Sequence, residues 1–166
     1  MSFRKVTLFF LIAFFCQLTL INIISVKGFA PNLIMCTVVI ITFLYEDGFR
    51  SIPFGIVFAL LLDICAATYM GISSILMLIV GIFAETARIW LNVEKLSTLM
   101  TTGAIATIIY ECGYWIFMRL LGSSMKLSYV LAQSMIFIVY NVLIMSIMFL
   151  VMHKKAERYH NDRYSI

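Results

Sequence analysis

Four ionisable side chains lie inside long apolar stretches of this sequence, where a charge is expensive to bury in lipid. They are Asp63, Glu85, Arg88 and Glu111. Intramembrane acids serve proton relays and ion pathways in transporters, so these side chains are the first candidates for chemistry. Two uncharged amides, Gln133 and Asn141, also lie in an apolar stretch and offer hydrogen bonds between helices.

The residue types needed for other kinds of catalysis do not come together in the sequence. The histidines, His153 and His160, lie in the polar C-terminal tail, so no Ser-His-Asp set falls in an apolar stretch. There is no H-E-x-x-H pair and no glycine-rich phosphate loop, and the four cysteines form no C-x-x-C pair. We therefore predict a protein that is not an enzyme and uses no metal or cofactor.

Asp63 follows two small residues, Gly55 and Ala59, at intervals of four. On a helix these three positions lie along one face, and a small-xxx-small face lets another helix approach closely in lipid. A carboxylate on that face is expected to point at protein rather than at acyl chains. The face therefore packs either inside the protein or against a partner helix.

The sequence offers no basic residue within reach of Asp63. We expect either a raised pKa, which keeps the acid neutral, or a hydrogen bond with an asparagine or glutamine to satisfy it instead. Counting from the expected outer turns places Asp63 and Glu111 within roughly 6 Å of the same depth, so they share a layer if their helices are adjacent. Glu85 and Arg88 are three residues apart near a helix end, and a local pair there contributes only about 0–1 kcal/mol if it is wetted.

Composition places the chain in the membrane. Hydrophobic residues make up 63%, charged residues 12%, and the mean hydropathy is +1.06. Soluble domains are about 45–50% apolar and about 25% charged. The net charge of +4 does not suggest a nucleic-acid surface. We predict one all-α integral membrane domain over residues 1–152, followed by a charged tail over 153–166 with little fixed structure.

The apolar runs predict a compact bundle of about six transmembrane helices. Gln17 and Asn22, in the first, are expected to face other helices. The expected ranges are Val6–Val26, Pro31–Tyr45, Ser51–Tyr69, Ile72–Leu91, Ser97–Leu121 and Leu127–Met152. The second is short for a full span, because a bilayer core of about 30 Å needs about 20 helical residues. Residues 31–69 form a re-entrant hairpin in the alternative topology.

Lysine and arginine placement sets the orientation. With both termini cytoplasmic, nine of the twelve basic residues fall on the cytoplasmic side and only Lys27, Arg119 and Lys126 fall outside. The re-entrant alternative keeps the same parity.

The stretch from Pro31 to Gly81 resembles the MreD family, the small membrane subunit of the bacterial rod-shape machinery. The resemblance rests on Pro31-Asn32-Leu33 opening a helix, on Gly55-x-x-x-Ala59-x-x-x-Asp63, and on Gly71 in the turn that follows. Asn32 stands where the family commonly has an acid, and Ala59 where it commonly has glycine. The sharp motif covers about a third of the chain.

The resemblance implies a non-catalytic scaffold in the bacterial cytoplasmic membrane. It implies binding to the shape factor MreC through its membrane anchor, and association with MreB filaments, RodA and its penicillin-binding transpeptidase partner. Membrane lipid and a second copy of the chain are further partners it allows. The family also resembles in fold the vitamin-binding subunits of energy-coupling-factor transporters, which gives the alternative function. Those subunits commonly carry an Ala-x-x-x-Ala motif on the first helix, whereas here Ala13 stands alone among bulky residues.

Overall fold

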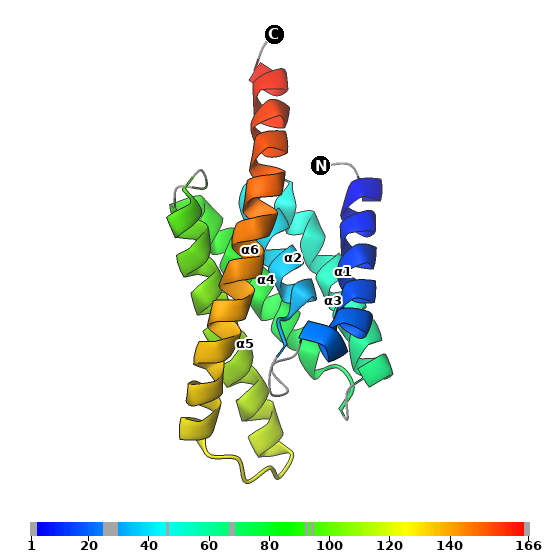
Figure 1. Ribbon diagram of the computed structural model, residues 1–166, viewed down its shortest axis with the longest axis vertical. Helices are drawn as coiled ribbons and strands as arrows, with labels where there is room; N and C mark the ends of the chain where they lie inside the picture. The colour runs from blue at the N-terminus through cyan, green and yellow to red at the C-terminus, as the bar shows by residue number, and fades with distance from the viewer. Residues whose placement is uncertain are drawn as a thin grey trace.

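The computed structural model describes residues 3–24, 30–45, 47–66, 69–91, 93 and 95–164. All regular structure in these ranges is helical. The elements are α1 (Phe3–Ile24), α2 (Leu33–Leu44), a 3-10 turn η1 (Gly48–Arg50), α3 (Ser51–Ala66), α4 (Ile72–Trp90), α5 (Leu96–Leu120) and α6 (Leu127–Tyr164). The helices run alternately up and down, so α1 begins and α6 ends at the same end of the bundle (Figure 1).

The short helix α2 is the centre of the molecule. It packs on each of the other five helices, and every residue from Ile34 to Phe43 is buried. Its 12 residues extend only about 18 Å, which is too short to cross a hydrocarbon core of about 30 Å. The expected second helix therefore exists at the predicted place but does not span by itself. Its irregular N-terminal backbone is tolerated at membrane depth because protein surrounds it.

Three stretches of the described chain are long and apolar enough to cross a membrane. They are Gly48–Cys65, Ile72–Trp90 and Leu127–Met152. Helix α5 is present as expected, and its 25 residues exceed the roughly 20 that a transmembrane helix needs. It is more polar than those three stretches, because it includes Glu111, Arg119 and several threonines. The first of the three stretches covers η1 and α3 up to Cys65, so α3 together with η1 is long and apolar enough to cross a membrane.

The C-terminal tail differs from the expectation of little fixed structure. Helix α6 continues without interruption to Tyr164 and projects beyond the bundle (Figure 1). The sequence Lys154-Lys155-Ala156-Glu157-Arg158 explains this, since all of these residue types have high helix propensity and no glycine or proline follows. A charged stretch without apolar periodicity can therefore extend a helix that packing has already nucleated.

Candidate functional site

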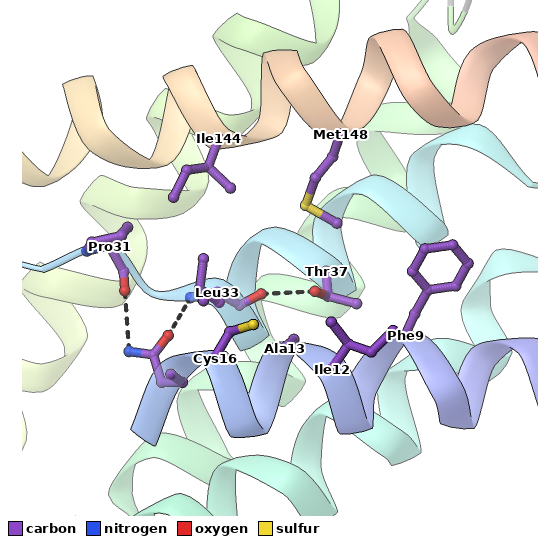
Figure 2. A pocket seen from close by; sticks show the side chains of 10 residues that line it. Phe9, Ile12, Ala13, Cys16, Pro31, Leu33, Thr37, Ile144 and Met148 are labelled. Carbon is purple, nitrogen blue, oxygen red and sulfur yellow. Dashed lines mark hydrogen bonds between the residues drawn. The ribbon is translucent and has the colours of Figure 1, made fainter. Parts of the chain in front are cut away.

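An apolar groove lies between α1 and α6, with α2 as its floor (Figure 2). Within the described residues α1 and α6 do not pack on each other, so the groove separates them. Its volume is about 390 Å³. The lining residues are Phe9, Ile12, Ala13, Cys16, Gln17, Pro31, Leu33, Thr37, Ile144 and Met148. Ile144 and Met148 point from α6 toward α1 across the opening (Figure 2).

The polar groups that line the groove are already used inside the protein. The Gln17 amide donates from Nε2 to the carbonyl of Pro31 at 3.1 Å and accepts at Oε1 from the N–H of Leu33 at 2.7 Å. The hydroxyl of Thr37 donates to the Leu33 carbonyl at 2.8 Å (Figure 2). The groove therefore presents a surface with little remaining demand for hydrogen bonds.

The first turn of α2 is held from three directions. Besides Gln17 on α1, the side chain of Asn32 accepts from the N–H of Met35 at 3.0 Å as the N-cap. From α6, Asn141 Oδ1 accepts from the N–H of Asn32 at 2.9 Å, and its Nδ2 donates to the hydroxyl of Thr107 on α5 at 3.2 Å. These bonds satisfy N–H groups that a buried helix start would otherwise leave unpaired.

Asp63 has a different partner from the one that the sequence predicted. It is only 2% exposed, and its Oδ2 accepts from the backbone N–H of Gly71 at 2.9 Å and of Ser73 at 3.1 Å. Among the described residues no asparagine or glutamine bonds to this carboxylate, and Asp63 instead caps α4 from the preceding helix. Gly71 has φ 90° and supplies no side-chain cap of its own, so the carboxylate satisfies the first turn and its positive dipole end.

The small face of α3 lies inside the protein. Gly55 is buried and Ala59 is fully buried. A Cβ built at Gly55 would overlap Cγ2 of Val38 on α2. Of the two possibilities for this face, the structure shows the internal one, with α2 as the helix that approaches.

Asp63 and Glu111 are brought to one region, although their helices do not touch. Helix α4 lies between α3 and α5, which do not pack on each other within the described chain. Tyr110 and Tyr114 on α5 are nevertheless within electrostatic range of both carboxylates. Two tyrosines that no sequence pattern marks thus lie near both acids.

The other predicted polar residues do not join this region or the groove. Glu111 and Gln133 are half-buried, and neither makes a hydrogen bond within the described part of the chain. The side chain of Asn22 lies outside the described residues. Glu85 and Arg88 form the predicted local pair, with Nη1 2.9 Å from Oε1.

This pair is less wetted than expected. Its side chains are 20% and 26% exposed, and the second oxygen of Glu85 is buried with no hydrogen-bond partner in the described structure. Removing Arg88 would leave a carboxylate in partly desolvated surroundings, which costs more than the loss of a surface pair.

We therefore expect Arg88→Ala to lower the free energy of unfolding by about 1–3 kcal/mol. Arg50→Ala is the control, since Arg50 is 64% exposed and lies 3.9 Å from Asp47, and its loss should cost about 0–1 kcal/mol. Thermal unfolding in detergent measures both. Equal effects of the two substitutions would show that burial does not distinguish the pairs.

No protein-family model matches the chain, and no curated protein or solved structure matches it either.

Proposed function

We propose that this protein is a non-catalytic scaffold subunit of the bacterial elongation machinery, similar to MreD, in the cytoplasmic membrane. Its direct partner in this proposal is the membrane anchor of an MreC-like shape factor. MreB filaments, RodA and the transpeptidase partner of RodA are the wider assembly. The observation that carries the proposal is the apolar groove between α1 and α6.

A partner's transmembrane helix suits this groove. Helices associate in lipid through close packing, and small residues allow it. Ala13 and Cys16 on α1 are small, and Thr37 on the floor is short, so these side chains leave room for a knob from another helix. Because Gln17 is bonded to the α2 start, a partner helix needs no polar group to meet it.

The transporter alternative fits the groove less well. A site for a vitamin-like molecule uses a few polar groups that fix the ligand's orientation. The Gln17 amide and the Thr37 hydroxyl are committed to the backbone of Pro31 and Leu33. A polar ligand would have to break these bonds, which leaves buried groups unpaired.

The charge distribution supports an orientation with both termini in the cytoplasm. The start of α1 and the projecting end of α6 lie at one end of the bundle, together with the α2–α3 and α4–α5 connections (Figure 1). Nine of the twelve basic residues belong to these segments. Of the remaining three, Arg119 and Lys126 belong to the α5–α6 connection at the opposite end, in accordance with the excess of Lys and Arg in cytoplasmic loops, and Lys27 lies outside the described residues.

Filling the groove tests the proposed partner site. We expect Cys16→Trp to abolish co-purification of the MreC-like protein and rescue of cell shape, because the indole occupies the space that the partner helix needs. The matched control is Cys65→Trp, since Cys65 is exposed on α3 and does not line the groove. Both variants should elute as folded protein in size-exclusion chromatography.

Two outcomes would contradict the proposal. One is that Cys16→Trp, while folded, retains the partner as well as the control does. The other is that the wild-type protein co-purifies instead with an ATPase-linked coupling subunit or a bound vitamin, which would support the transporter.

A further inference from the structure

The turn between α5 and α6 reaches farther from the centre of the bundle than the α3–α4 connection at the same end. Helices α4 and α5 both adjoin the 91–95 connection, but α4 has 19 residues and α5 has 25. At 1.5 Å per residue, α5 therefore extends roughly 9 Å beyond the far end of α4. Figure 1 shows the turn, in yellow, lying beyond the α3–α4 connection. We call residues 113–132 the hairpin tip.

The hairpin tip is an ordered structure. The indole Nε1 of Trp115 donates to the carbonyl of Met125 at 3.0 Å, which ties α5 to the start of α6. The guanidinium of Arg119 donates to the carbonyl of Ser123 at 3.3 Å. Gly122 has φ 94°, a conformation that only glycine adopts readily, and this allows the chain to turn sharply. These two hydrogen bonds and the sharp turn at Gly122 therefore hold the end of α5 next to the start of α6.

The surface of the tip is apolar and basic together. Its exposed apolar residues include Ile116, Leu120, Leu121, Met125 and Leu127, of which Leu120 is 78% exposed. Arg119 and Lys126 are also exposed, and residues 113–132 contain no acidic residue. Exposed apolar side chains in such number are unfavourable in water and mark a surface that another apolar phase covers.

Three features of the tip match the boundary layer of a bilayer. Trp115 and Tyr129 have the amphipathic rings that concentrate at membrane interfaces. Leucine, isoleucine and methionine side chains suit the acyl-chain boundary, and basic side chains suit anionic phosphates. Arg119 uses one of its N–H groups on Ser123, so others remain free to bind a phosphate.

We propose that the hairpin tip inserts into the headgroup layer of the leaflet opposite the termini and binds anionic phospholipid through Arg119 and Lys126. The complementary charge decides this occupant, because the two cations belong to a stretch, residues 113–132, that contains no acid, and phosphates are the anions of the headgroup layer. The site acts independently of any partner in the groove, so it does not depend on the proposed function.

Tryptophan fluorescence tests this binding on the purified full chain. The protein has two tryptophans, Trp90 at the opposite end and Trp115 in the tip, so Trp90→Phe leaves Trp115 as the only reporter. The protein is reconstituted in phosphatidylcholine vesicles that contain a minor fraction of brominated phosphatidylglycerol. We expect brominated phosphatidylglycerol to quench the fluorescence of Trp115 roughly three- to tenfold more strongly than the same fraction of brominated phosphatidylcholine does. The reason is that each basic residue near an anionic surface adds measurably to the attraction.

Two variants identify the residues responsible. Arg119→Gln combined with Lys126→Gln should remove the preference for phosphatidylglycerol, whereas a glutamine at 119 still offers a donor to the Ser123 carbonyl. The control is Arg50→Gln with Lys95→Gln, which removes two exposed charges at the opposite end and should leave the preference unchanged.

The proposal is overturned if both brominated lipids quench Trp115 equally, or if the preference survives in the Arg119→Gln, Lys126→Gln variant. It is also overturned if aqueous iodide quenches Trp115 strongly in every vesicle, because the tip would then lie in water. That last result would point to an extracytoplasmic protein with an acidic and apolar surface as the occupant.

Discussion

Replacing Asp63 with leucine is expected to lower the free energy of unfolding by about 2–4 kcal/mol, since two buried backbone N–H groups lose their acceptor at once. Those groups belong to Gly71 and Ser73, in the first turn of α4. Leucine has the same branched skeleton, with bulkier methyl groups in place of the two oxygens, and offers no acceptor. The α3–α4 turn should therefore loosen, and the expected readouts are a lower unfolding temperature and faster hydrogen exchange at Gly71 and Ser73.

Asp63→Asn is the informative comparison. An amide oxygen accepts the same two bonds, and asparagine is about as good as aspartate at a helix N-cap. We expect a loss below about 1 kcal/mol, from the weaker interaction with the helix dipole. Co-purification of the partner should follow stability in both variants, because Asp63 is only 2% exposed and cannot reach a partner directly.

Other results would change the role assigned to Asp63. If asparagine is as damaging as leucine although both proteins remain folded, the negative charge itself is needed, as in a proton relay. If leucine is tolerated, the cap does not stabilise α4. Unfolding in detergent separates these cases from one another, and cell-shape rescue then shows whether function follows stability.

Local spacing explains which features of the fold were predictable. The intervals between Gly55, Ala59 and Asp63 define one helix face whatever the rest of the chain does, so the sequence predicts that this face packs against protein but not which helix packs there. Pro31 and the apolar run after it likewise predict a helix that is short for a full span, although the predicted bundle counted this helix as one of about six spans. The Glu85–Arg88 pair depends only on helical geometry and forms as expected.

The contacts that the sequence did not reveal join distant parts of the chain. Asn141 meets the N–H of Asn32 across 109 residues, and its bond to Thr107 brings in a third helix. The cap on α4 depends on how α3 folds back through Gly71, which no residue pattern specifies. Gln17 was expected to face another helix, but its two backbone partners follow from the irregular start of α2.

Gly55→Ala is expected to lower the free energy of unfolding by about 1–3 kcal/mol through overpacking. The new methyl group would overlap Val38 Cγ2, and Val38 is fully buried on the central helix. A β-branched side chain in a helix has one strongly preferred rotamer, so Val38 cannot turn aside cheaply. Gly55→Leu should be worse and prevent accumulation of folded protein. Val57→Phe is the control for added bulk, because Val57 is 54% exposed on the same helix.

A double-mutant cycle separates internal packing from partner docking at Gly55. Val38→Ala alone should cost about 2 kcal/mol, since it leaves a cavity in the core. Combined with Gly55→Ala, the alanine at 38 removes the overlapping methyl, and the added methyl at 55 fills part of the space. The double variant should therefore be more stable than the sum of the single effects predicts, by about 1 kcal/mol or more. Strict additivity, together with a stable Gly55→Ala protein that has lost its partner, would show instead that this face of α3 docks another helix.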